Sequence, residues 1–264
     1  MDLHASLGKQ PSQPASISGT LDYEWQKGDT LEETDSPAQS ASPYWWLNSG
    51  GELFPEDGYS TTIQGDLPKS DRWYEDYSQS DQTDTDGGAH PQNLFRLVSR
   101  STWKNVRIET SFYIVNDNLS DSDQRYESNG LLLMSRYAKD GQTLYYAGVR
   151  VDGTAVIKKK FHGDYYTMAQ TQVFPGSYDR TDNPNLLPHD TWIYLRSETV
   201  TNADDSVNVR LYMQENNEWV LLLEARDDGG ATLDHSAPIT SSGFVGIRTD
   251  FMDVKFGAFH AQEL

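Results

Sequence analysis

Hydrophobic and polar positions in residues 129–167 form four short strand-like runs separated by turn-forming dipeptides, as in a β-meander. The runs are rich in β-branched, aromatic and aliphatic residues and comprise Leu131–Tyr137, Leu144–Val151, Ala155–Lys160 and Tyr165–Met168. Asp140-Gly141, Asp152-Gly153 and His162-Gly163 lie between them, and these residues tolerate the positive φ of two-residue hairpin turns. The segment therefore predicts antiparallel strands rather than helices.

Two-residue turns also predict which side chains share a face of this sheet. Tyr146 would pair with Lys159, and Lys159 with Tyr166 on the next strand. The same counting places five side chains on one face: Tyr137, Tyr146, Arg150, Lys159 and Tyr166. The meander is thus predicted to have an aliphatic core face and a face of tyrosine, lysine and arginine.

Strand-like runs continue through the rest of the chain, and no segment has a convincing helical pattern. They are Leu94–Ser99, Val106–Val115, Trp192–Thr199, Val207–Gln214, Trp219–Ala225, Gly243–Arg248 and Val254–Phe259. The prediction is an all-β protein with two packed antiparallel sheets. Residues 1–19 are polar and predict a flexible lead. Residues 20–264 predict one β-sandwich domain, with an irregular Trp-rich part over 20–90 and regular strands over 91–264.

Charge narrows the range of partners. The 264 residues carry a formal net charge of −19 and no cysteine, which excludes disulfides and thiolate metal sites. Residues 1–90 hold 17 acidic and 4 basic residues, a net of −13, so residues 91–264 carry only −6. Nucleic acid and anionic membranes need a basic footprint, and neither is expected as a partner. An acidic exterior can therefore coexist with a local basic surface in residues 91–264.

Targeting signals are absent from the printed sequence. No run approaches the roughly 18 apolar residues of a membrane span, and the N-terminus lacks the charged and apolar regions of a signal peptide. The chain is then either cytosolic or begins after a removed signal. Its richness in Trp, Tyr, Asn, Asp, Gly and Ser is typical of secreted glycan-handling proteins, so we expect an extracellular monomer that binds a polysaccharide.

The order of the strand segments resembles a known superfamily. NLFRLVSRSTWKNVRIETSFYI, SNGLLLMSRY, LYYAGVRVDG, HDTWIYLRSE, VNVRLYMQENNEWVLLLEA and GFVGIRTDFMDVKFGAFHA together resemble the concanavalin A-like, laminin-G-like jelly roll. The resemblance covers about residues 92–262 and implies a jelly-roll sandwich. It does not fix an activity, because this fold hosts lectins, carbohydrate-binding modules, glycoside hydrolases and polysaccharide lyases.

Neither enzyme branch of this superfamily matches by motif. The laminarinase-like hydrolases carry an E-x-D-x-x-E strand, whereas Glu109 and Glu224 here have no partner at that spacing. The jelly-roll alginate lyases carry R-x-E-L-R, Q-I-H and Y-x-K-x-G-x-Y-x-Q. The corresponding last strand has Phe244 in place of the first tyrosine, and the strand from Asn129 has no Q-I-H. No catalytic residue is therefore transferred from either branch.

The predicted Tyr/Lys/Arg face has the groups that β-elimination of a uronate requires. A cation must neutralise the carboxylate, and an acid–base group must move protons at C5 and at the leaving oxygen. Tyr146, Tyr166 and nearby His162 are candidate proton carriers, and Arg150 and Lys159 are candidate neutralising cations. A non-catalytic glycan surface and ordinary cross-strand decoration of a solvated sheet are the alternatives, and the sequence leaves all three open.

Other residues supply candidate glycan contacts. Tyr137 belongs to the same face, and Arg96, Arg100 and Arg136 form a second set whose guanidinium groups suit carboxylate or sulfate, unless they pair with nearby Asp and Glu. Trp46 is a candidate stacking platform. Its neighbour Trp45 would point to the opposite face of an extended segment, so one of the two is expected in the core. Trp192 and Trp219 are both predicted core residues.

A structural calcium ion is the one cofactor that the sequence suggests, and no organic cofactor is expected. Asp22, Asp250 and Asp253 are candidate oxygen ligands, and the resemblance implies a calcium near the chain ends. No EF-hand loop or zinc spacing is present. Taken together, the sequence favours an extracellular lyase of an acidic, uronate-containing polysaccharide, with a carbohydrate-binding module or lectin that uses the same face as the alternative.

Overall fold

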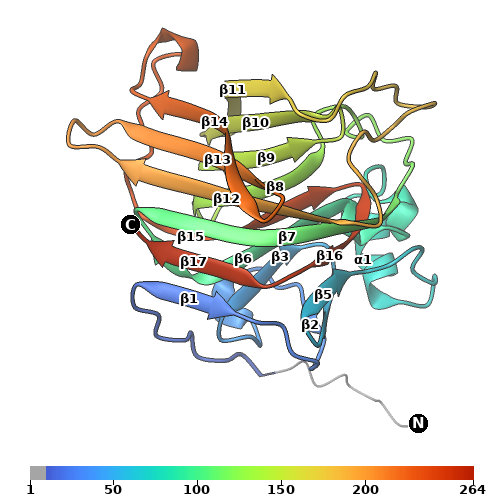
Figure 1. Ribbon diagram of the computed structural model, residues 1–264. Coiled ribbons are helices and arrows are strands. Elements are labelled where there is room, and N and C mark those ends of the chain that lie inside the picture. Colours follow the sequence, from blue (N-terminus) through green and yellow to red (C-terminus); the bar gives the residue numbers. More distant parts are fainter. Residues whose placement is uncertain (1–9) are drawn as a thin grey trace.

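The computed structural model describes residues 10–264 and contains two antiparallel β-sheets that face each other (Figure 1). The ten-stranded sheet consists, in spatial order, of β14 (Glu218–Asp227), β13 (Val207–Glu215), β12 (Trp192–Thr201), β7 (Val106–Asp117), β16 (Met252–Phe256), β5 (Tyr59–Thr62), β4 (Glu52–Glu56) and β2 (Leu31–Glu32). It also contains β17 (Phe259–Glu263), which pairs with β7, and β1 (Thr20–Tyr23), which pairs with β17.

The second sheet has seven strands. In spatial order these are β11 (Asp164–Gln172), β10 (Thr154–Phe161), β9 (Leu144–Arg150), β8 (Gly130–Tyr137), β15 (Gly243–Asp250), β6 (Leu94–Trp103) and β3 (Trp45–Ser49). Strands distant in sequence are neighbours, since β15 lies between β8 and β6. The predicted all-β, antiparallel two-sheet jelly-roll sandwich is confirmed. The strands before residue 63 belong to both sheets.

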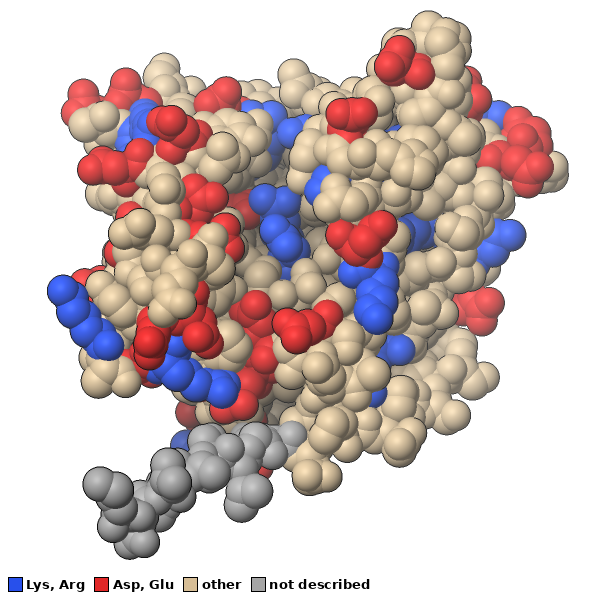
Figure 2. All heavy atoms as spheres, turned by 180° about the vertical axis from the view of Figure 1, so that it is seen from behind, with Lys and Arg blue, Asp and Glu red and all other residues tan. Residues whose placement is uncertain are grey.

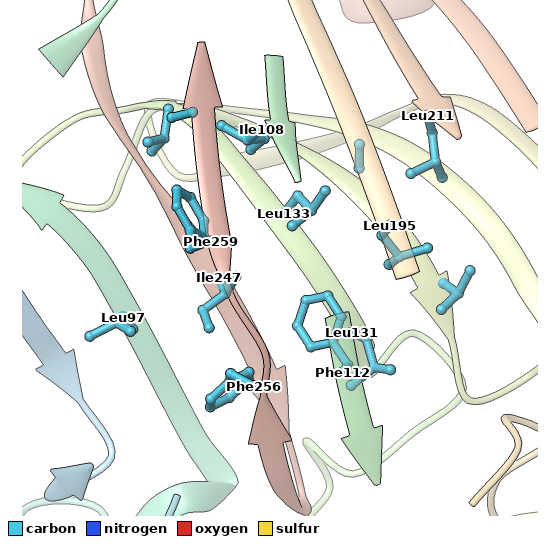
Figure 3. Close-up of a cluster of buried hydrophobic side chains, with 14 of the residues drawn as sticks. Leu97, Ile108, Phe112, Leu131, Leu133, Leu195, Leu211, Ile247, Phe256 and Phe259 are labelled. Carbon is cyan, nitrogen blue, oxygen red and sulfur yellow. The ribbon is translucent and has the colours of Figure 1, made fainter. Parts of the chain in front are cut away.

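The core lies between the sheets and is built from alternate residues of their strands. Figure 3 shows Leu97, Leu131 and Ile247 of the seven-stranded sheet beside Phe112 and Leu195 of the ten-stranded sheet, all at most 1% exposed. Burying such a side chain stabilises the fold by about 1.5–3 kcal/mol. Period-two alternation therefore fixes which side chains of the seven-stranded sheet point into the core and which point away from it.

The predicted register of the meander is wrong at its second turn. Lys158, not Lys159, pairs with Tyr146, because the turn has three residues and ends at Gly153. Gly153 has a φ of 79°, and its N–H donates to the carbonyl of Arg150 at 2.9 Å. This is the three-residue hairpin in which a glycine in the left-handed region follows a turn. A shift of one residue exchanges the faces of the strand, so Lys159 points into the core.

At the Asp140-Gly141 turn a two-residue loop would place Ser135 opposite Tyr146, but Met134 pairs with Tyr146, so the register is shifted there as well. The remaining turn and strands agree with the sequence to different degrees. The His162-Gly163 turn has two residues, and Lys159 pairs with Tyr166 as predicted. The expected strand Val254–Phe259 is instead divided between β16 and β17. The predicted absence of helix is wrong, because α1 (Arg72–Ser80) lies beside the sandwich (Figure 1). Helix α1 is too short to cross a membrane. Within residues 10–264, no helix is both long enough and apolar enough to do so.

The predicted flexible lead falls partly outside the described residues, which begin at residue 10. Ser12 and Ala15 donate backbone hydrogen bonds to the carbonyls of Ser40 and Pro43. The Arg100 guanidinium also donates to Ser12. Residues 12–15 therefore contact the body of the protein, and the flexibility of the lead stays a prediction.

Helix α1 begins at a capped end, which gives a test of its stability. Asp71 precedes the helix, and its carboxylate accepts a hydrogen bond of 2.8 Å from the N–H of Trp73. We expect Asp71→Ala to lower the free energy of unfolding by about 1 kcal/mol, because an N–H of the first turn loses its partner. Denaturant titration measures this change. Asp71→Asn keeps the acceptor and is the control, so an equal loss in both variants would contradict the capping role.

Candidate functional site

The outer face of the seven-stranded sheet carries a second apolar cluster. Its buried members come from five strands of this sheet: Trp46, Val98, Leu132, Met134, Tyr137, Leu144, Tyr146 and Val156. The polar side chains of the face lie next to this cluster, at positions of the same parity along each strand. A packed apolar layer beneath polar groups holds those groups in place, as a binding site requires.

A cleft of about 730 Å³ lies on this side of the molecule, between the sheet and the elements around α1. Arg96, Arg248 and Tyr165 line it from the sheet, and Tyr77 and Glu33 line it from the opposite wall. Figure 2 shows the corresponding hollow, with basic side chains inside it and acidic side chains around it. Its size lies within the range of about 300–1,000 Å³ that is usual for ligand pockets.

Two arginines occupy paired positions in the floor of the cleft. Arg96 of β6 lies directly opposite Arg248 of β15 in the antiparallel ladder. Arg248 forms an ion pair of 2.8 Å with Asp250 and donates to the Tyr146 hydroxyl at 3.1 Å. Within residues 10–264, no carboxylate forms an ion pair with Arg96. Arg96 is therefore a partly buried cation in the cleft whose charge is not neutralised by an ion pair.

Two tyrosines stack beside Arg248 and differ in acidity. The rings of Tyr146 and Tyr165 are nearly parallel, with centroids 6.2 Å apart. Burial raises the pKa of Tyr146 to about 12, against the lowering effect of Arg248. Burial also raises the pKa of Tyr165, but Arg248 and Lys160 together lower it below its ordinary value. The pair thus combines a phenol that stays protonated with one that ionises more readily.

The opposite wall contains a hydrogen-bonded carboxylate. The Tyr77 hydroxyl donates to Glu33 Oε2 at 2.6 Å, and the N–H of Gly51 donates to the same oxygen at 2.8 Å. Burial raises the pKa of Glu33, and the two hydrogen bonds oppose this shift. Asp76, Asp81 and Asp84 line the same side of the cleft. Basic groups therefore lie on the sheet, together with Asp250, which is paired with Arg248, whereas the other acidic groups lie on the wall formed by the N-terminal part.

The structure separates the five residues predicted to share the Tyr/Lys/Arg face. Tyr137, Tyr146 and Arg150 lie on the outer face, where Arg150 pairs with Asp152 at 2.9 Å. Lys159 is fully buried on the core side in an ion pair with Asp227, which corrects its placement. Tyr166 pairs with Lys159 in the ladder and so lies on that side as well.

The structure places the predicted proton carrier His162 and the predicted glycan-binding residues Arg100 and Arg136 away from the cleft, whereas Arg96 lines it. His162 is exposed in the turn between β10 and β11 and does not line the cleft. Arg100 donates to the carbonyls of Ser12 and Ser42. Arg136 is 2% exposed and donates to the Lys104 and Ile239 carbonyls.

The tryptophan predictions need a correction. Trp45 and Trp46 are both buried, in the apolar clusters on opposite faces of the seven-stranded sheet, so Trp46 offers no stacking platform. Trp192 and Trp219 are only partly buried, and both line a groove on the ten-stranded sheet. The prediction that these two residues belong to the core is wrong.

The three candidate calcium ligands each bond to different partners and not to a shared site. Asp22 contacts His260, Asp250 pairs with Arg248, and Asp253 accepts hydrogen bonds from Gly65, Gln92 and Asn118. The described part of the chain contains no cluster of three or more Asp, Glu or His residues arranged to hold a metal ion. Calcium binding remains a prediction, to be tested by its effect on activity.

Five residues of the cleft or of the sheet face beside it were not predicted from the sequence: Tyr165, Lys158, Glu33, Tyr77 and Arg248. The first two follow from the register of the second turn, since a three-residue loop moves Lys158 onto the outer face opposite Tyr146. Tyr165 then follows, because it pairs with Lys160 on that face. Glu33 and Tyr77 carried no local signal, because their approach depends on contacts between distant segments.

Comparison with known proteins adds a likeness of architecture. No protein family matches the sequence, and no curated protein is similar to it in sequence. Among solved structures, the carbohydrate-binding module CBM66 from Bacillus subtilis is 12% identical, with a TM-score of 0.45 over 96% of this chain and 100% of that one. The alginate lyase Aly36B, solved as a mutant in complex with alginate tetrasaccharide, is 9% identical. Its TM-score is 0.45 over 94% of this chain and 98% of that one.

A β-glucanase from Bacillus licheniformis is also similar, with 7% identity and a TM-score of 0.48 over 94% of this chain and 100% of that one. Such low identities and TM-scores below 0.5 carry no information about what this chain binds or cleaves.

Proposed function

We propose that the protein is an extracellular polysaccharide lyase that cleaves an acidic, uronate-containing glycan in the cleft on the seven-stranded sheet. The observation that carries this proposal is the stacked pair of Tyr146 and Tyr165 beside Arg248, with Arg96 in the opposite ladder position. A uronate presents a carboxylate for the arginines and hydroxyls for the acidic wall. The asymmetric charge of the cleft suits a sugar of this kind.

The proposed reaction is β-elimination. Arg96, assisted by Arg248, neutralises the uronate carboxylate, which makes the C5 proton more acidic. The Tyr165 phenolate takes that proton, the C5–H electron pair forms the C4=C5 double bond, and the C4–O bond breaks. The leaving oxygen receives a proton from the Tyr146 hydroxyl, whose raised pKa keeps it protonated. The products are an unsaturated uronide and a new polymer end.

A non-catalytic binding module is the rival function, and one observation favours it. Asp250 already compensates the charge of Arg248 through an ion pair of 2.8 Å, which leaves Arg96 as the principal cation for the sugar. One such cation is sufficient for binding, whereas efficient elimination benefits from stronger neutralisation. Both functions use the same cleft and differ in whether a double bond is formed.

The experiment that separates them follows the ultraviolet absorbance of the unsaturated uronide over time. Alginate, glucuronan, pectate, ulvan and glycosaminoglycans serve as substrates, with and without calcium. A rise on one polymer, which is abolished in Arg96→Gln, supports the lyase and identifies its sugar. A flat trace together with retardation in native gels that contain one of these polymers supports the binding module. If no polymer gives a rise in absorbance and none retards the protein, both the lyase and the binding module are ruled out.

The lowered pKa of Tyr165 predicts the pH dependence of the reaction. Activity should rise with pH as Tyr165 loses its proton, with the midpoint below the ordinary tyrosine value. Lys160→Met removes one of the two cations that favour the phenolate, so its rising limb should shift to higher pH. The measurement is kcat/KM as a function of pH for both proteins. A limb that does not move would contradict the role of Tyr165 as the base.

A further inference from the structure

A second groove lies on the other side of the sandwich, on the outer face of the ten-stranded sheet. It has a volume of about 490 Å³ and is separated from the cleft by the full thickness of the two sheets. Trp192 and Tyr194 of β12 and Trp219 of β14 line it, together with the small residues Ser111 and Gly257. None of these residues takes part in the proposed lyase site.

The strand register explains how this groove forms. Tyr194 lies opposite Ser111, and the N–H of Gly257 donates to the Ser111 carbonyl, so small residues continue across the sheet. A Cβ atom added to Gly257 would lie 2.2 Å from Ser111 Oγ and 3.6 Å from an atom of the Trp192 ring. The absence of a side chain at Gly257 thus keeps the floor of the groove low beside Trp192.

Neighbouring side chains hold the two indole rings in place. The Arg196 guanidinium lies 4.2 Å from the centre of the Trp219 ring and is itself fixed by Glu109 at 2.9 Å. Trp192 packs against Tyr113, with ring centroids 5.4 Å apart. Within residues 10–264, the indole N–H groups of both tryptophans have no hydrogen-bond acceptor. Each ring therefore offers an oriented apolar surface with a free donor at its edge.

We propose that this groove binds a neutral polysaccharide segment, independently of the acidic polymer in the cleft. Sugar rings have apolar C–H faces, which pack on indole rings, and hydroxyl groups, which match the free N–H donors and the oxygens of Ser111 and Glu109. Glu109 and Arg196 neutralise each other, so Glu24 is the remaining carboxylate among the described lining residues, and no lysine or arginine lines the groove. The groove thus lacks a cation for an anionic polymer, which distinguishes it from the cleft.

The test is affinity electrophoresis of the full chain in native gels that contain xylan, mixed-linkage β-glucan, laminarin or galactomannan. We expect at least one of them to retard the wild-type protein, and Trp219→Ala to weaken binding about tenfold or more. Gly257→Leu fills the groove once the Ser111 hydroxyl, 2.2 Å from the new Cβ, rotates away, and the backbone of Gly257 lies outside the left-handed region. It should abolish retardation as well.

Two control variants separate this proposal from its alternatives. Leu221→Ser changes an apolar side chain that is 48% exposed on β14 but does not line the groove, and Tyr165→Phe changes only the cleft. Both should be retarded like the wild type. The proposal is overturned if no neutral polymer retards the wild type, if Gly257→Leu binds normally, or if Tyr165→Phe loses neutral-polymer binding. Binding in the groove is independent of lyase activity in the cleft, so Gly257→Leu should retain lyase activity.

Discussion

Replacing Lys159 with methionine is expected to lower the free energy of unfolding by about 3–5 kcal/mol, because it leaves a buried carboxylate without its cation. Lys159 Nζ lies 2.8 Å from Asp227 Oδ2, and both side chains are fully buried. The ammonium also donates to the carbonyls of Ser236 and Ala237, and the Tyr145 hydroxyl donates to Asp227. Urea titration of the wild type and the variant measures the difference.

The neighbouring lysine is the matched control. Lys158 precedes Lys159 on β10 but points to the outer face and forms no ion pair among residues 10–264, so Lys158→Met should change stability far less. Lys159→Met combined with Asp227→Leu should recover much of the loss, because the unpaired charge is removed. Equal destabilisation by Lys158→Met and Lys159→Met would show that the buried pair is not the cause.

Replacing Tyr165 with phenylalanine is expected to reduce lyase kcat by about 10²–10⁴-fold, the usual contribution of a general base. The ring that stacks on Tyr146 remains, so retention of the acidic polymer in native gels should be almost unchanged. Initial rates of uronide formation, compared with gel retardation, separate the loss of chemistry from a loss of binding.

Tyr166 provides the control for this substitution. It follows Tyr165 on β11 but belongs to the opposite face, where it pairs with Lys159. Tyr166→Phe also removes one phenolic hydroxyl and should retain nearly full activity. If Tyr166→Phe is inactive while Tyr165→Phe is active, the assignment of the proton carrier to the outer face is wrong.

The architecture followed from sequence because period-two patterns and turn residues are local signals. The register did not follow from the sequence, because Asp152-Gly153 is compatible with both a two-residue and a three-residue hairpin loop. A two-residue type I′ turn requires positive φ at both positions and a type II′ turn at the first, whereas here only the second residue, Gly153, adopts it. Gly153 is held there by Phe174, whose N–H donates to the Gly153 carbonyl. A contact with a later loop thus decided whether Lys158 or Lys159 reached the core.

The candidate site was predictable only in its chemical character. Tyr146 and Arg96 were identified from sequence; Arg96 lines the cleft, and Tyr146 is buried beside it, bonded to Arg248 of its lining. Glu33 and Tyr77 are brought to the same place by a hydrogen bond between segments 44 residues apart. Arg248 reaches Tyr146 across 102 residues, through the pairing of β15 with β8 and of β8 with β9. Nothing in the local sequence around these residues encodes such distant strand neighbours.

The pairing of β1 with β17 has a mechanical consequence. Thr20 at the start of β1 lies opposite Gln262 near the end of β17, so the chain enters and leaves this ladder at the same end. A force that pulls these two ends apart would load the hydrogen bonds one after another rather than together. We therefore expect β1 to peel away like a zipper under low tension, until the pulling reaches Trp25, which is anchored in the core by its hydrogen bond to Gly257.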